Sequence, residues 1–219
     1  MTATARIASL IQPTALSLLT RQLMDVLFLE IDNQKILASN DSNAKETQKA
    51  INSFYCNGEM NLFDYRFQNF DLSELNAICV NPQRETVESH STVRSQVSAI
   101  FNITLFGGST AEVSDHDVFE KLERMSGIIR AILESGQYLT LGLPGGVISR
   151  TNVGGRQFYY PNGVENAEAL NIVNIDYTVY YDEARLRAEP LKFLGDTLRA
   201  DGRYTLISDY ESKTTQIGG

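Results

Sequence analysis

Asp115, His116 and Asp117 form the one cluster in this sequence whose side-chain types suit metal binding or proton transfer. Neighbouring residues at the start of a helix point in different directions, so three successive side chains make a poor set of ligands. Acidic residues in a first helical turn also interact favourably with the positive end of the helix dipole. We therefore expect this cluster to stabilise a helix start, and we predict no metal-binding and no catalytic residue.

Motifs of nucleotide-binding and hydrolytic enzymes are absent from the sequence. It has no phosphate loop with Gly-Lys-Ser/Thr, no Gly-x-Gly-x-x-Gly turn and no Gly-x-Ser-x-Gly nucleophile elbow. Its two cysteines, Cys56 and Cys79, lack the spacing of metal ligands, and only two histidines could join them. The sequence therefore indicates reduced thiols, no cofactor and a protein that is not an enzyme.

The composition is that of an ordinary globular protein of 219 residues, with 42% hydrophobic and 21% charged residues. The 19 lysines and arginines against 27 aspartates and glutamates give a formal net charge of −8, which disfavours sustained binding to the DNA backbone. No apolar run approaches the about 20 residues that cross a bilayer, and the N-terminal apolar run is too short for a signal peptide. We expect a soluble protein made in the cytoplasm, without a membrane or sequence-specific nucleic acid partner.

Two segments have the pattern of long strands. Apolar and polar residues alternate over 97–105 and again over 172–182, the period of a strand that buries one face. Ile100 and Phe106 interrupt the polar side of the first segment, so we expect its second face to be partly covered.

A helix is predicted between these strands. Ser114 has the place of an N-cap, and apolar residues at helical spacing then predict a helix over 118–135, ended near Gly136. The apolar face consists of Val118, Leu122, Met125, Ile129 and Ile132. An extended pattern resumes at 138–143, so helix and strands together indicate a two-layer α/β arrangement.

The N-terminal part predicts a second amphipathic helix over 16–27. Residues 29–37 either continue this helix or form a short strand, and 38–49 has the polar composition of a loop that becomes a short helix. The aromatic run 54–70 is either a small satellite core or a partner-binding patch. We interpret 32–76 as an inserted segment, and we expect the carboxylates of Asp25 and Glu30 to be solvated.

Shorter extended segments flank the two long strands. A strand over 77–80 is expected to end at Asn81 and Pro82, and 84–94 has the pattern of a charged hairpin arm or sheet edge. The glycine-rich span 144–163 predicts tight turns around a short strand at 157–160.

The order and spacing of these elements resemble those of the tail terminator proteins of tailed bacteriophages, also called tail-completion or head–tail joining proteins. The segments that carry this resemblance are 16–27, 97–108, 118–135, 138–143 and 172–182. The resemblance implies an α+β fold in which two amphipathic helices pack on a mixed, mainly antiparallel sheet. We expect one domain over 1–207, with the 32–76 insertion, and a flexible tail over 208–219.

The same resemblance implies a structural virion protein rather than an enzyme, with no metal or cofactor. Such proteins form a ring, usually of six subunits, that caps the tail tube and docks to the head connector. The implied partners are further copies of the chain, the tail tube protein, in some phages the sheath protein, and the connector or neck protein. The implied location is the tail or neck of the virion, assembled in the host cytoplasm.

The arm 84–94, the glycine-rich span 144–163 and the tail 208–219 are the segments that we expect to contact partners. The candidate interface residues are Arg84, Glu88, Arg94, Gly145, Gly146, Gly154, Gly155 and Tyr210. Two other hypotheses remain: an adaptor or tube-like subunit elsewhere in a phage neck or baseplate, and a metal-dependent hydrolase that uses Asp115 and His116.

Overall fold

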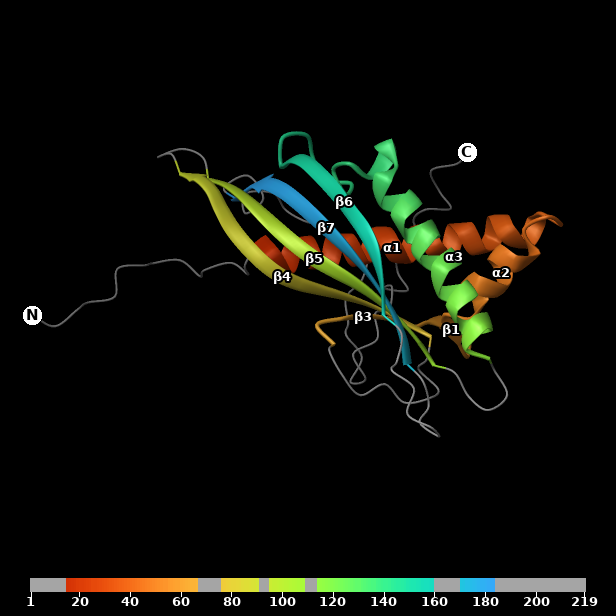
Figure 1. Cartoon of the computed structure of the whole chain (residues 1–219). Helices are drawn as coiled ribbons and strands as arrows, with labels where there is room; N and C mark the ends of the chain where they lie inside the picture. The colour runs from red at the N-terminus through yellow and green to blue at the C-terminus, as the bar shows by residue number, and fades with distance from the viewer. Residues whose placement is uncertain (1–14, 67–75, 91–94, 109–113, 160–169, 184–219) are drawn as a thin grey trace, which may run out of the picture.

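The computed structural model describes residues 15–66, 76–90, 95–108, 114–159 and 170–183 of the chain (Figure 1). The helices are α1 (Ala15–Asn40), α2 (Lys45–Asn52) and α3 (Asp115–Glu134). The strands are β1 (Tyr55–Cys56), β2 (Glu59–Met60), β3 (Leu62–Asp64), β4 (Ala77–His90), β5 (Ser95–Gly108), β6 (Ile148–Tyr159) and β7 (Leu170–Asp182). The fold is α+β, as the sequence predicted.

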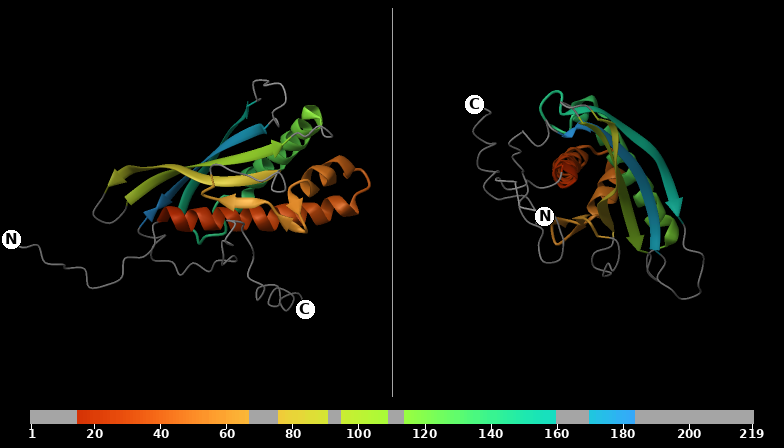
Figure 2. Two further views of the ribbon diagram at one scale, coloured as in Figure 1. Left: turned by 90° about the horizontal axis from the view of Figure 1, so that it is seen from below. Right: turned by 90° about the vertical axis from the view of Figure 1, so that its left-hand side faces the viewer.

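A mixed five-stranded sheet forms one layer of the fold. Its strand order is β3-β4-β5-β7-β6, in which β3 runs parallel to β4 and every other pair is antiparallel. Helix α1 packs against β3 and β4, and α3 packs against β5, β7 and β6. Figure 2 shows both helices on the same side of the curved sheet, so the described part of the chain has two layers.

The interface of α3 with β5 and β7 is the centre of the hydrophobic core. The Ser114 hydroxyl accepts a hydrogen bond from the Asp117 backbone N–H at 3.2 Å, which confirms the predicted N-cap. The predicted apolar face of the helix is buried throughout: Val118, Leu122, Met125, Ile129 and Ile132. It lies in one core cluster with Phe101 of β5 and Tyr177 of β7, which are opposite each other in the strand register.

The opposite face of the sheet is partly covered, as the interruptions in the β5 pattern indicated. Phe106 forms a second buried cluster with Phe63, Ala77 and Cys79. Neighbouring residues of a strand point to opposite faces, and Leu105, next to Phe106, belongs to the main core. This second cluster is therefore on the side away from α1 and α3.

The described part of the segment 32–76 begins inside α1 and packs into the rest of the fold. Residues 29–37 continue α1, which settles the alternative between helix and strand. Helix α2 contacts both α1 and α3, and β3 joins the main sheet. Phe54 lies in the main core and Phe63 in the second cluster, so these aromatic side chains are core residues; Phe67 and Phe70 lie outside the described residues.

The expected end of a strand at Asn81 and Pro82 is wrong, because β4 continues to His90. Strand β3 pairs with β4 only at Ile78–Val80. At Pro82, therefore, β4 pairs only with β5 among the described strands. A proline lacks a backbone donor but is tolerated where a strand lies at a sheet edge or bulge. The register shift between Pro82 and Arg84 marks such a bulge.

The expected strand at 138–143 is also wrong. Gly136–Tyr138 forms a 3-10 helix after α3, and the chain then makes further turns. Leu141 and Gly142 have φ angles of 50° and 75°, which are incompatible with an extended strand. The C-cap of α3 is Ser135 rather than Gly136.

Residues 157–159 of the short strand expected at 157–160 are part of β6, which begins much earlier, at Ile148. Gly154 and Gly155 therefore lie within a strand, at a register shift between Val153 and Arg156, instead of in a turn. A Cβ atom on Gly154 would lie 3.0 Å from the backbone oxygen of Asp176 on β7. The close approach of the two strands at this bulge accounts for the glycine.

Truncation of a core residue of α3 tests this packing. Ile129→Ala should lower the free energy of unfolding by about 2–5 kcal/mol, because it removes buried methyl groups and leaves a cavity. The matched control is Ile36→Ala, since Ile36 of α1 is 56% exposed and should change stability by no more than about 0.5 kcal/mol. Equal losses of stability in urea unfolding of the two variants would contradict the assignment of the core.

Candidate functional site

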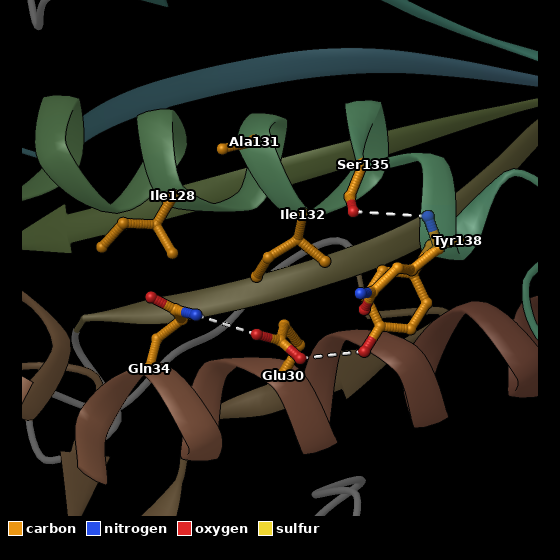
Figure 3. Close-up of a pocket in the computed structure, with 8 residues that line it drawn as sticks. Glu30, Gln34, Ile128, Ala131, Ile132, Ser135 and Tyr138 are labelled. Carbon is orange, nitrogen blue, oxygen red and sulfur yellow. Dashed lines mark hydrogen bonds between the residues drawn. The ribbon is translucent and has the colours of Figure 1, made fainter. Parts of the chain in front are cut away.

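A groove between α1 and α3 is a concave site in the described part of the chain. It has a volume of about 240 Å³ (Figure 3). Figure 3 shows Ile128 and Ile132 of α3 across the groove from Glu30 and Gln34 of α1, with Tyr138 at one end. The other lining residues are Ala131, Ser135 and Gln137. The groove thus has an apolar wall and a polar wall.

The carboxylate of Glu30 organises the polar wall. It accepts hydrogen bonds from the Tyr138 hydroxyl at 2.8 Å, the Gln34 side-chain amide at 2.8 Å and the Asn33 side-chain amide at 3.0 Å. Two of these donors are on the next turn of α1, whereas Tyr138 follows α3 and lies 108 positions along the chain. The Glu30–Tyr138 hydrogen bond therefore joins α1 to the turn that follows α3, at one end of the groove.

These hydrogen bonds keep Glu30 ionised. Partial burial by itself would raise the pKa of Glu30, but the bonds from Gln34, Asn33 and Tyr138 together outweigh it and hold that pKa below its ordinary value. Burial and the adjacent carboxylate raise the pKa of Tyr138, so its hydroxyl keeps the proton that it donates. All three donors are neutral groups, and no described lysine or arginine forms an ion pair with Glu30. As far as the described residues go, the groove consequently carries one uncompensated negative charge at neutral pH.

The candidate interface residues from the sequence lie elsewhere, at two opposite edges of the sheet. Arg84 and Glu88 are exposed on β4, where the Glu88 carboxylate accepts a hydrogen bond from the Ser98 hydroxyl at 2.6 Å. Gly145 and Gly146 form an exposed turn before β6, and Gly154 and Gly155 lie at the β6 bulge. Strands β5 and β7 separate these two groups, so one subunit does not bring them together. The remaining two, Arg94 and Tyr210, lie outside the described residues.

The cluster Asp115, His116 and Asp117 is exposed at the first turn of α3. Within the described ranges no group of three or more histidine, cysteine, aspartate or glutamate side chains could hold a metal ion. Cys56 and Cys79 are not joined by a disulfide.

Expecting Asp25 and Glu30 to be solvated was wrong. Asp25 is only 1% exposed within the buried face of α1, and Glu30 is partly buried in the groove. Asp25 could have been recognised, because its neighbours Met24 and Val26 belong to the apolar face of the helix. The pairing of Glu30 with Tyr138 depends on the packing of α1 against α3, and nothing in the local sequence of either residue indicates it.

Two comparisons with known proteins found no match. The chain matches no known family, and the search of curated proteins found no match either. Among the described helices, none is sufficiently long and apolar to cross a membrane. The functional argument therefore depends on geometry and on the element order of the fold.

Tyr138→Phe tests the electrostatics of the groove. Without the phenol hydroxyl, the pKa of Glu30 should rise. A carboxyl whose pKa is lowered by folding stabilises the fold above its unfolded pKa, and this contribution is lost as the pH falls through the folded pKa. In the variant this contribution should be smaller, and its loss should be complete at a higher pH. NMR titration of the Glu30 carboxyl carbon would measure the raised pKa. Tyr159→Phe is the control, because the Tyr159 hydroxyl donates to Gln157 on β6, and an equal shift there would contradict the assignment.

Proposed function

We propose that this chain is a structural virion protein of a tailed bacteriophage, a tail terminator whose copies form a ring that caps the tail tube and joins it to the head connector. The element order supports this proposal. An N-terminal amphipathic helix, a long strand, a core helix and a late tyrosine-rich strand occur in the order on which the resemblance is based. The strand expected directly after the core helix is replaced by turns, with β6 following later.

The single observation that carries the ring proposal is the pair of open sheet edges. Strand β6 pairs only with β7, and β4 beyond Val80 pairs only with β5, within the described residues. Unpaired edge strands offer backbone donors and acceptors to another chain. A contact that joins two different edges is head-to-tail, and repetition of such a contact closes into a ring when the rotation between subunits allows it.

Irregularities in both edge strands limit how much regular strand pairing can contribute to the contact between subunits. Each edge strand has two register shifts, in β4 after Pro82 and after Val87, and in β6 after Ile148 and after Val153. Bulges and edge charges such as that of Arg84 disfavour indiscriminate pairing. The proposed contact therefore combines short paired stretches with side chains and loops.

The candidate interface residues at these edges are Arg84, Glu88, Gly145, Gly146, Gly154 and Gly155, with Arg94 and Tyr210 added from the sequence. The proposed partners are neighbouring copies, the tail tube and possible sheath, and the connector, within the tail or neck of the virion. The net charge of −8 is compatible with DNA passing through the ring without adhering to it.

The alternative function is that of a neck or baseplate adaptor. The α1–α3 groove favours it, since an adaptor needs a docking surface on a single subunit.

The edge contact is tested by the double variant Asn152→Lys and Gln157→Lys. Both residues are exposed on β6, and the added charges should block pairing and convert the ring to monomers. The control is Asn40→Lys with Asn43→Lys, which adds the same charge near the turn between α1 and α2 and should leave the ring intact.

Light scattering at low and high salt measures the outcome, on the full chain and on a chain ended after Ile207. Because exposed ion pairs are screened over about 10 Å at 0.1 M salt, a ring held by backbone pairing and apolar contact should persist at high salt. A monomer under all conditions, even with a tail tube protein present, would contradict the ring proposal.

A further inference from the structure

We propose that the groove between α1 and α3 binds a segment of a second protein in which a lysine or arginine is flanked by aliphatic side chains. The cation would contact Glu30, and the aliphatic groups would pack on the α3 wall and along the neighbouring face of α1. This binding site is separate from the sheet edges and does not depend on formation of a ring.

The charge of the groove selects a cation. The Glu30 carboxylate is held ionised by the amides of Gln34 and Asn33 and the hydroxyl of Tyr138. These donors are neutral, so none of the described groups that bind the carboxylate compensates its charge. A partner ammonium or guanidinium group would form a charge-assisted hydrogen bond in a partly desolvated site, where it is stronger than on an open surface. The phosphates of a nucleic acid would be repelled by the same carboxylate.

The apolar wall and the size of the groove select a side chain. Ile128, Ala131 and Ile132 of α3 line the groove together with Glu30 of α1, so they would cover the methylene groups of a lysine or arginine bound there. The volume of about 240 Å³ is below the roughly 300–1,000 Å³ of typical small-molecule sites. A protruding side chain with its neighbours fits this space better than a cofactor does.

An exposed apolar stripe extends the groove along α1. Leu37 lies two turns after Glu30 and one turn after Gln34, so it is on the same face of the helix, and it is 53% exposed. Leu29 and Ile36, which are 41% and 56% exposed, continue the surface around the helix. Isolated exposed apolar residues need no explanation, but three on one stretch of helix beside a charged groove are typical of a surface that docks an amphipathic segment.

A titration followed by methyl NMR tests the proposal on the full chain. The probe is a short amphipathic peptide with lysine and leucine at helical spacing, compared with the same peptide carrying glutamate in place of lysine. The lysine peptide should shift the methyl signals of Ile128, Ala131, Ile132 and Leu37, while the buried Ile129 shifts little. The glutamate peptide should leave all of them unchanged.

Two variants separate a specific site from general attraction to an acidic protein. Glu30→Gln keeps the shape of the side chain and should weaken binding of the lysine peptide roughly tenfold or more, the effect of losing one charge-assisted hydrogen bond. Glu123→Gln removes the same charge from an exposed position of α3 that does not line the groove, and should change affinity little. Thermal melting of each variant verifies that it is folded.

Three results would overturn the proposal: equal binding by Glu30→Gln and the unchanged chain, equal weakening by Glu123→Gln, or methyl shifts that map outside the groove. Concentration-dependent shifts of the groove methyls without peptide would show that a second copy of the chain occupies the groove, and would also overturn it.

Discussion

The packing of α3 against β5 and β7 is the constraint on which the rest of this structure depends. One apolar stripe of the helix covers the face of the sheet that carries Phe101 and Tyr177. Burial raises the pKa of the Tyr177 phenol to about 12, so this core side chain stays neutral over the physiological range. Because α3 and α1 share this face, neither helix covers the sheet edges, and among the described residues β6 pairs only with β7 and β4 beyond Val80 only with β5.

The position of α1 follows from the same packing and creates the groove. Its buried face contacts β3 and β4, while its C-terminal half runs beside α3 with Glu30, Gln34 and Leu37 turned toward the seam or to solvent. The hydrogen bond from Tyr138 to Glu30 closes one end of this seam. A single arrangement of two helices on a sheet therefore provides two separate kinds of surface, one of backbone edges and one of side chains.

Local sequence was sufficient where one face of an element is buried and the other is not. The alternation in β5 and β7 and the capped periodic stripe of α3 predicted these elements, because burial on one side imposes periods of two and 3.6 residues. Prediction from the local sequence failed where tertiary packing overrides local signals. Pro82 is tolerated in β4 because the strand is an edge there, and Gly154 belongs to a bulge forced by close approach to Asp176. The groove was missed because its polar wall requires Glu30 and Tyr138 to meet across two helices.

The central claim, that the open edges of this sheet join copies of the chain head-to-tail, concerns an assembly rather than a single subunit. Negative-stain electron microscopy of the purified full chain tests it most directly, because a closed ring and a monomer differ in shape as well as in mass. The account predicts uniform rings with a central opening and one copy of the sheet per repeating unit. Small single particles without a central opening, at concentrations where light scattering is also measured, would contradict it.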